Sequence, residues 1–461
     1  MDQRDWAIAT IAAYCLLMLG IGAWATRRTH DAEDFFLSGR KLGPWIVALA
    51  QGATQSSAWT LAGVSGAAFL WGRHAMWLWV SVVAGYIVNW LWIAPRLRRI
   101  SARTGSITLV QLLFDGPERR LLRRISSAII LLSFLFYVAA QFEAAGQAFS
   151  VSLGLPVAVC IAAGAAITVG YTLAGGFWAA SVTDVVQAVL MLVIAFVLPA
   201  AALLAVGGFD GIMAAAAADS APGRPPFTAG IAFVIGVMGI GLAAPGQPHV
   251  INHFMAARDD AAIRRGGLIA IAWIALILAG MLVVGWAGRA LAVPPGNPET
   301  VLYAAAQAWL PPMFAGIVTV AVMSAIMSTV DSQLITATSS LTVDANAQSG
   351  AAGLSRARLA LLGFSLLAVA LAIWAPEAIY SRVLFAWNAL GAAFGPLVFL
   401  AVMGRIPSAR AALTGLLSGF LLTVVFYLAP EAPGDLLERI APFFIALLLV
   451  VAIDRRVQAP A

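Results

Sequence analysis

Hydrophobic residues gather in runs of about 20 along almost the whole chain, with short polar loops between them. A run of this length is what an α-helix needs to cross the hydrocarbon core of a bilayer. Windows of this width predict about thirteen spans and therefore an all-α integral membrane protein. The approximate limits of the spans are residues 5–26, 44–71, 74–95, 125–152, 155–176, 181–206, 228–250, 267–288, 313–342, 358–375, 380–403, 409–430 and 438–453.

Two of these spans contain residues that a continuous lipid-facing helix does not favour. Residues 52–57 read Gly-Ala-Thr-Gln-Ser-Ser, and residues 240–248 combine Gly with two Pro. Pro removes a backbone donor and clashes with the preceding helical turn, so we expect broken helices near both segments. Two interrupted spans set five apart are the sequence sign of inverted repeats with a binding site near the membrane midplane.

We expect one transmembrane domain over residues 1–461, because no loop is long enough to form a soluble domain and the C-terminal tail is short. The repeats are predicted at about 44–206 and 228–403, in a five-plus-five inverted arrangement. The first apolar run lacks a cleavage-site pattern, so we expect a retained span and not a signal peptide. The extra helices are 5–26, 409–430 and 438–453.

Composition agrees with this class, since 62% of residues are hydrophobic and only 10% are charged. The net charge of +6 comes mainly from arginines that gather in alternate loops. Cytoplasmic loops collect Lys and Arg, so the distribution predicts an outside N-terminus and an inside C-terminus in the cytoplasmic (inner) membrane. The basic segment 96–124 is expected to lie on the inner surface as an amphipathic helix.

The span 313–342 carries an unusual polar stripe. Ser324, Ser328, Asp331 and Ser332 recur at helical spacing, and Thr329 lies beside them. Small oxygen ligands presented together are what a hard monovalent cation needs when it sheds its hydration shell. A carboxylate at membrane depth needs a partner, a cation or water.

An unwound backbone near residues 53–56 would offer free carbonyls to the same cation. The first cation site is therefore predicted at Ala53, Ser56, Ala325, Ser328 and Thr329. For any one of these residues, close helix packing is the commoner role in a membrane. The combination with a broken helix favours binding.

The other buried acids leave alternatives open. Asp184 ends the sequence Ser-Val-Thr-Asp before an apolar run, which fits a helix cap, alone or with a place on an ion path. Glu143 is expected to face a substrate cavity, pair with an Arg or reach the surface. His249 and His253 favour a helix-end or gate role over zinc, because no acidic third ligand is near. The sequence lacks nucleotide-binding and nucleophile motifs, so ATP-driven transport and covalent catalysis find no support.

Several separated motifs, in order, make the chain resemble the sodium:solute symporter family, and within it the bacterial sodium/proline symporter branch. The resemblance spans about residues 35–419. The motifs are 36–44 (Phe-Leu-Ser-Gly-Arg-Lys-Leu-Gly-Pro), 171–187 (Tyr at its start, Gly-Gly-Phe at 175–177 and Thr-Asp at 183–184), 246–249 (Gly-Gln-Pro-His), 327–333 (beginning Met-Ser-Thr) and 391–396 (Gly-Ala-Ala-Phe-Gly-Pro).

The resemblance implies thirteen helices, a LeuT-like five-plus-five fold, and import of a small organic solute coupled to Na⁺. By position, the family's sodium site falls on the five residues predicted above. A second cation site or proton path falls on Asp184, Asp331 and Ser332, with Ser328 shared, and Asp331 supplies a carboxylate where family members with this site have a hydroxyl. No cofactor is implied beyond Na⁺ as the coupling ion.

The pocket differs from that of the proline symporters, which have an essential Asp at the position of Gln55 and aromatic residues at those of Ile240 and Ala244. We therefore expect an amino acid or a related compound and not proline itself, with Asp331 replacing part of the charge missing at residue 55. The predicted substrate-binding residues are Gln55, Ser57, Gln141, Glu143, Ile240, Ala244 and Gln247.

Three other functions stay open at this stage. A proton-coupled symporter of the same fold would use Asp331 and Asp184, and Asp331→Asn would impair it more than a sodium carrier. A transporter-like solute sensor would show no net uptake, and a passive channel would not concentrate its solute. The expected partners are the solute, Na⁺ and the lipid bilayer, with no nucleic acid. Enzymatic activity is not expected.

Overall fold

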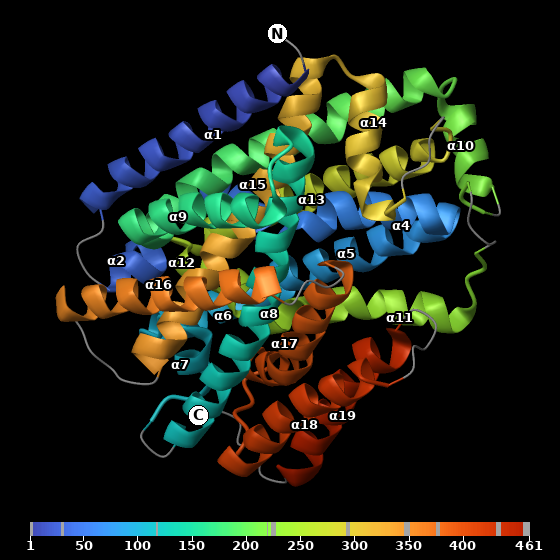
Figure 1. Ribbon diagram of the computed structural model, residues 1–461. Helices are drawn as coiled ribbons and strands as arrows, with labels where there is room; N and C mark the ends of the chain where they lie inside the picture. The colour runs from blue at the N-terminus through green and yellow to red at the C-terminus, as the bar shows by residue number, and fades with distance from the viewer. Residues whose placement is uncertain are drawn as a thin grey trace.

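The computed structural model describes residues 3–28, 32–116, 119–218, 220–222, 227–291, 296–344, 351–374, 379–429 and 435–454. Across these residues the regular elements are helices, and the one bridge between extended segments joins Leu42 to Ala257. Figure 1 shows the helices packed into one bundle, with α18 and α19 side by side at its edge. The α-helices are α1 (Gln3–Ala25), α2 (Ala32–Leu37), α3 (Pro44–Gln55), α4 (Val64–Trp71), α5 (Met76–Val88), α6 (Ala94–Thr104), α7 (Leu109–Leu113), α8 (Arg120–Leu153), α9 (Val157–Ala205), α10 (Phe209–Ala217), α11 (Ile231–Leu242), α12 (Pro248–Ala256), α13 (Asp260–Gly288), α14 (Val301–Trp309), α15 (Pro312–Ser339), α16 (Ala351–Trp374), α17 (Ile379–Val402), α18 (Ala409–Tyr427) and α19 (Leu436–Ile453).

The helix α15 lies at the centre of the bundle. All of its residues from Val318 to Ser339 are buried, and it packs against α1, α3, α8 and α9. A helix that is apolar on every side except for one polar stripe must place that stripe against protein, because lipid offers no hydrogen bonds. Ser328 and Asp331 therefore face other helices.

Both predicted breaks are confirmed. The helix α3 ends at Gln55, Ser56 adopts an extended conformation, and helical structure resumes with the short helix η3 (Trp59–Gly63). The second break separates α11 from α12, which are bent by 48° relative to each other across η7 (Ala244–Gly246). Backbone groups that lose their helical partners at such breaks can bind side chains, a solute or an ion.

The number of membrane spans differs from the expectation. The described residues contain ten helices that are long and apolar enough to cross a membrane, or eleven if the bent pair counts as one span. Two of the ten are much longer than one crossing, because Trp59–Thr104 has 46 residues and Val157–Ala205 has 49. Gly176, with a φ of 56°, breaks the helical geometry inside α9. The predicted count of thirteen is not confirmed.

The single surface helix predicted over 96–124 is wrong. The helix α6 stops at Gly105, whose left-handed conformation ends a helix, and Thr108 caps the separate helix α7 by accepting from the N–H of Gln111. Leu109 and Phe114 are each only 1% exposed. The apolar face of this segment meets other helices of the protein, which local periodicity alone cannot distinguish from a lipid surface.

An arginine network joins α6 to the start of α13. Asp260 accepts from Arg98 at 2.7 Å and from Arg99 at 2.8 Å. Arg98 also donates to the carbonyls of Ala257 and Arg258, beside the bridge between Leu42 and Ala257. These contacts hold the segment before α3 and the end of α12 together at this end of the bundle. We call Arg98, Arg99 and Asp260 the arginine network.

Candidate cation and solute site

The end of α3 meets the polar stripe of α15. Ser328 Oγ donates to the carbonyl of Ala53 at 3.0 Å, and Thr329 Oγ1 donates to the carbonyl of Thr54 at 3.0 Å. Both hydroxyls also lie within hydrogen-bond distance of the carbonyl of Ala325. The structure thus brings together four of the five residues that the sequence predicts for the first cation site.

The fifth residue, Ser56, follows directly at the break. Its N–H donates to the carbonyl of Ala53, and its buried Oγ has no hydrogen-bond partner in the part of the chain that is described. The cluster therefore consists of carbonyl and hydroxyl oxygens without a formal charge. A bare monovalent cation can take the place of the hydroxyl hydrogens as the partner of the carbonyl oxygens, with the hydroxyl oxygens turned toward the ion.

An acidic network lies on the other side of Thr54. Thr54 Oγ1 donates to Asp184 Oδ2 at 3.2 Å and lies 3.0 Å from Ser332 Oγ. The hydroxyl of Tyr171 donates to Asp331 Oδ2 at 2.8 Å. Both carboxyl groups are fully buried, and each has one oxygen without a hydrogen-bond partner among the described residues. Two buried carboxylates are costly unless a cation or a proton neutralises them.

The capping role considered for Asp184 is wrong. Asp184 lies in the middle of α9, because the break in that helix occurs at Gly176, eight residues earlier. His253 Nε2 lies 3.8 Å from Asp184 Oδ2, and the same nitrogen lies 3.5 Å from Thr54 Oγ1. His249 and His253 are both buried within the bundle.

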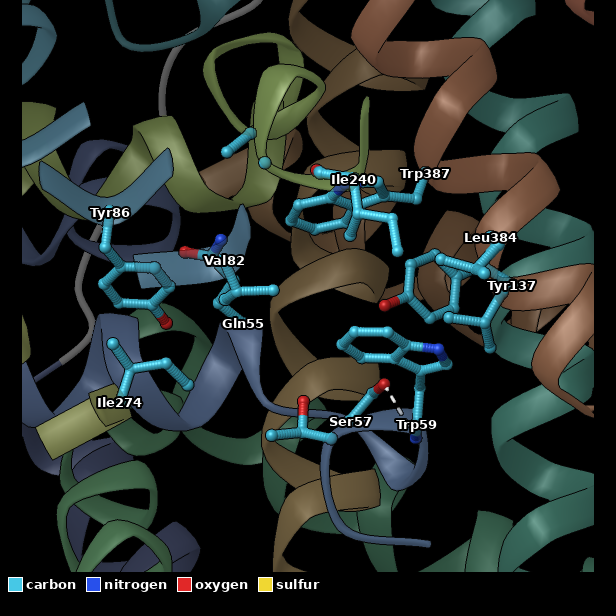
Figure 2. Close-up of a pocket in the computed structure, with 14 residues that line it drawn as sticks. Gln55, Ser57, Trp59, Val82, Tyr86, Tyr137, Ile240, Ile274, Leu384 and Trp387 are labelled. Carbon is cyan, nitrogen blue, oxygen red and sulfur yellow. Dashed lines mark hydrogen bonds between the residues drawn. The ribbon is translucent and has the colours of Figure 1, made fainter. Parts of the chain in front are cut away.

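A small central cavity lies next to the break after α3. Four aromatic residues line it, namely Trp59, Tyr86, Tyr137 and Trp387. In Figure 2, the indole of Trp59 lies beside the hydroxyl of Tyr137, and the backbone N–H of Trp59 donates to Ser57 Oγ at 3.2 Å. A concave, mostly apolar site with a few polar groups is typical of small-molecule binding.

Four of the predicted substrate residues line this cavity, and three do not. Gln55, Ser57, Ile240 and Ala244 belong to its walls. Gln141 Oε1 instead accepts from the N–H of Ala58, and Gln247 donates to the carbonyls of Ala243 and Trp387, so both glutamines brace the broken helices. Glu143 is 5% exposed and accepts from Gln147 Nε2 at 3.4 Å, which places it outside the wall of the central cavity.

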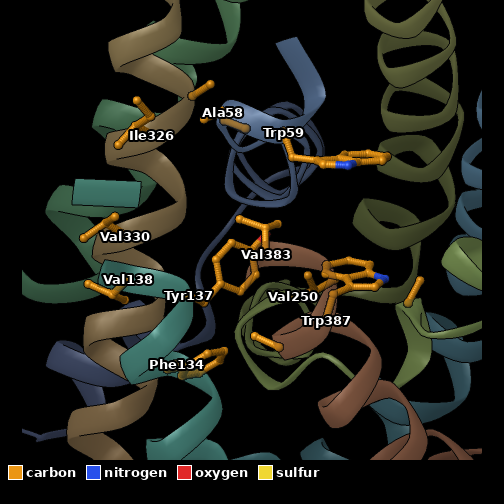
Figure 3. Close-up of a cluster of buried hydrophobic side chains, with 14 of the residues drawn as sticks. Ala58, Trp59, Phe134, Tyr137, Val138, Val250, Ile326, Val330, Val383 and Trp387 are labelled. Carbon is orange, nitrogen blue, oxygen red and sulfur yellow. The ribbon is translucent and has the colours of Figure 1, made fainter. Parts of the chain in front are cut away.

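Sequence reasoning did not single out the aromatic walls. Figure 3 shows Trp59, Tyr137 and Trp387 continuing into a buried apolar cluster with Val383 and Ile326. These side chains come from η3, α8, α15 and α17, so only the folded chain brings them together. Thr54, Tyr171 and His253 were also missed as members of the acidic network, although Tyr171 opens one of the family motifs.

A model of the sodium:solute symporter family matches residues 35–419. The chain belongs to the sodium:solute symporter family. It is 34% identical to the sodium/proline symporter of Escherichia coli (strain K12), over 91% of this chain and 87% of that protein. It is 33% identical to the high-affinity proline transporter of Bacillus subtilis (strain 168), over 96% of each chain.

Solved structures show the fold. A sodium-coupled sialic acid symporter in a substrate-bound, outward-open state matches with a TM-score of 0.81 and 19% identity, over 97% of this chain and 96% of that chain. A nucleobase-cation-symport-1 family transporter matches with a TM-score of 0.55 and 13% identity, over 91% and 95%. The chain is therefore a multi-pass membrane transporter and not an enzyme, and its family takes Na⁺ and a small-molecule solute as partners.

Proposed function

We propose that this protein is a sodium-coupled secondary active symporter that imports a small organic solute, an amino acid or a related compound, by alternating access. The observation that carries the proposal is the meeting of Ser328 and Thr329 with the carbonyls of Ala53 and Thr54. The two carbonyls belong to the end of α3, and the chain that follows them places Gln55 and Ser57 in the wall of the central cavity. One short stretch of backbone thus contacts both the proposed cation and the proposed solute.

This arrangement gives a physical basis for coupling. A cation bound by Ala53, Ser56, Ala325, Ser328 and Thr329 fixes the unwound end of α3 and with it the cavity wall at Gln55 and Ser57. Solute binding then favours the same backbone conformation, so each ligand raises the affinity for the other by the same factor. An ion gradient drives uptake through this reciprocity.

The cavity supports a solute other than proline. Gln55 carries no charge, and Ile240 and Ala244 are the aliphatic side chains on the broken helix that face the space. The cavity still offers the amide of Gln55 and the hydroxyl of Tyr86, which is 1% exposed and has no hydrogen-bond partner in the described structure. An amino acid or a relative with an apolar body fits such walls.

The pair Asp184 and Asp331, with Ser332, is proposed as a second cation site or a proton path. The alternative function is a proton-coupled symporter of the same fold, which the burial of both carboxyl groups favours. A bound Na⁺ or a proton would each relieve the cost of the two buried carboxylates.

The remaining features of the proposal concern architecture. Thirteen spans and a five-plus-five inverted repeat over about 44–206 and 228–403 are supported by the two breaks and by the double-length runs that include α5 and α9. An outside N-terminus and an inside C-terminus in the inner membrane are supported by the arginines gathered near α6 and the start of α13. The proposal includes no cofactor besides the coupling ion.

Thermal stabilisation of the purified protein tests the proposed function. Amino acids, carboxylates and sugars are added with and without Na⁺ at fixed pH, and ligands that bind the folded state raise the apparent unfolding temperature by mass action. We expect an amino acid or a relative to stabilise only when Na⁺ is present. Stabilisation that does not depend on Na⁺ but changes with pH would instead support the proton-coupled alternative.

A further inference from the structure

The face of α5 that borders the central cavity continues past the cavity wall to Asn89. Val82 and Tyr86 of α5 line the cavity, and Figure 2 shows both on the same side of it as Gln55. Asn89 follows Tyr86 by three residues, and residues three apart on a helix are neighbours on its surface. Asn89 therefore lies about one helical turn beyond the cavity wall, toward the arginine network, since Arg98 follows on α6.

The same part of α5 packs against the second broken helix. Gly85 lies so close to α11 that an added Cβ would be 2.7 Å from the carbonyl oxygen of Gly241, which lines the cavity. The π-helical turn η5 (Asn89–Ile93) contacts η7 at the second break. Because 3.6 residues make one helical turn, Asn89 projects between the directions of Gly85 and Tyr86. It thus lies where α5, the second break and the cavity meet.

The side chain of Asn89 is buried without a partner. It is 1% exposed, and neither its Nδ2 nor its Oδ1 forms a hydrogen bond within the described part of the chain. The neighbouring hydroxyl of Tyr86 is buried and equally unpaired among these residues. Buried polar groups that make no hydrogen bond cost stability, and turns of the π-helical kind are frequent at functional sites. Two such groups side by side therefore point to a ligand.

A nearby buried amide shows the contrast. Trp90 Nε1 donates to Gln51 Oε1 at 3.1 Å, and Gln51 Nε2 donates to Gln55 Oε1. Gln51 is thus engaged through both its oxygen and its nitrogen, whereas Asn89 is engaged through neither. The fold satisfies the amide that only supports α3 and leaves the amide beside the cavity available to a ligand.

The chemistry of an amide restricts what this ligand is. An amide presents a donor and an acceptor side by side. A carboxylate would satisfy only the Nδ2 donor of Asn89, and an ammonium group only its Oδ1 acceptor. A carboxamide offers both in one plane and can exchange two hydrogen bonds with Asn89. The described residues that line the central cavity include no charged side chain, which agrees with a neutral group.

We propose that Asn89 and Tyr86 form a subsite for a carboxamide group, so that the transported solute is an amide-bearing amino acid or a related compound. The inference rests on the proposed function, because it places this group on the solute that the central cavity binds. Tyr86 and Gly241 both line the cavity and border Asn89, so the group enters between them with a shift of the second break. A site of this kind rejects an apolar analogue, because its buried polar groups would be left unpaired.

Two series of compounds with nearly equal shapes test this preference. L-asparagine, L-aspartate and L-leucine end in an amide, a carboxylate or two methyl groups, and L-glutamine, L-glutamate and L-homoleucine repeat the series with a longer side chain. Each is titrated against the apparent unfolding temperature of the full-length protein in NaCl. We expect one of the two amides to reach half of its effect at a roughly tenfold lower concentration than both of its counterparts do. The proposal is wrong if neither amide is preferred.

Asn89→Leu replaces the amide with an apolar group of the same shape. Since it removes two unpaired buried groups, we expect the unfolding temperature without ligand to rise by roughly 2 °C, and the preference for the amide to be lost. Asn89→Ala, which needs less space, should also lose the preference. A preference that survives either substitution would overturn the proposal. A fall in the unliganded stability of Asn89→Leu would do so too, because it would show a structural role for the amide.

Asn252→Leu is the matched control. Asn252 on α12 is 3% exposed, but its Nδ2 donates to Thr336 Oγ1 at 3.1 Å. The same substitution therefore removes a hydrogen bond that is made, and we expect the unliganded unfolding temperature to fall while the preference for the amide stays. Loss of the preference in this variant as well would contradict a specific role for Asn89.

The salt used in the titration separates this inference from the proposed function. A preference for the amide that is equal in NaCl and KCl would support the subsite and contradict sodium coupling. Stabilisation that requires Na⁺ but is stronger with leucine or homoleucine than with the amides would support the proposed function and overturn the carboxamide subsite.

Discussion

Thr54 connects the two groups of candidate cation ligands within a single residue. Its carbonyl accepts from Thr329, and its hydroxyl donates to Asp184 and lies near Ser332. The backbone and the side chain of one residue move together. A shift of the Thr54 carbonyl when a cation binds at the first site would therefore also shift the Thr54 hydroxyl that donates to Asp184. The stripe on α15 was predictable from helical periodicity, but Thr54 was not, because its role depends on α9 and α15 at once.

The hydroxyl of Ser328 provides the sharpest test at this scale. Ser328→Ala removes one of the five proposed oxygen ligands and one of the two donors to the carbonyl of Ala53, which keeps the N–H of Ser56. We expect the Na⁺ concentration for half-maximal thermal stabilisation to rise roughly tenfold, which corresponds to about 1.4 kcal/mol. A Na⁺ titration of the apparent unfolding temperature measures this change.

Ser339→Ala is the matched control on the same helix. Ser339 Oγ donates to the carbonyl of Thr336, three turns from the proposed site, and this substitution should leave the Na⁺ dependence unchanged. Equal shifts in the two variants, or none in either, would mean that Ser328 does not ligate the ion.

At the scale of elements, the two breaks were predictable from Gly, Ser and Pro, but the function of nearby glutamines was not. Gln141 and Gln247 are predicted to bind solute, and in the structure their side-chain amides bond to the backbone of Ala58 at the first break and of Ala243 and Trp387 around the second. A buried side-chain amide can bind a solute or a backbone group equally well, and only the position of its atoms in the folded protein shows which of these it contacts. The supposed cap at Asp184 failed for a similar reason, since a local four-residue motif does not show that α9 continues through it.

The arginine network makes a prediction about the end of the bundle at which it lies. Asp260→Asn weakens the pairs with Arg98 and Arg99, which hold α6 against the start of α13. With Cys15 and Cys160 replaced by Ala, a thiol introduced by Ala257→Cys reports on opening. We expect Asp260→Asn to raise its alkylation rate roughly fivefold, because two partly exposed ion pairs contribute about 1 kcal/mol together.

Asp259→Asn provides the control for this measurement. Asp259 caps α13 by accepting from the N–H of Ala262, which lowers the pKa of Asp259, and it pairs with the exposed Arg258. Asn retains the capping ability, so the alkylation rate should stay near that of the parent protein. A rate that rises equally in both variants would show that the network does not keep this end closed.

At the scale of the whole molecule, hydrophobic runs and family motifs were enough to predict the class of fold. The aromatic walls of the central cavity were not predictable, because Trp59, Tyr137 and Trp387 are separated by long stretches of sequence and belong to different helices. The surface helix expected over 96–124 failed because its apolar residues are covered by the rest of the bundle. Both cases depend on tertiary packing and not on local pattern.

The measurement that tests sodium coupling most directly is solute accumulation in proteoliposomes under an imposed Na⁺ gradient. The solute is the compound found by thermal stabilisation, and internal and external pH are kept equal. We expect accumulation above the external concentration, and its loss when a sodium ionophore collapses the gradient. Accumulation driven by a proton gradient without Na⁺, or uptake that never exceeds equilibration, would contradict sodium-coupled symport.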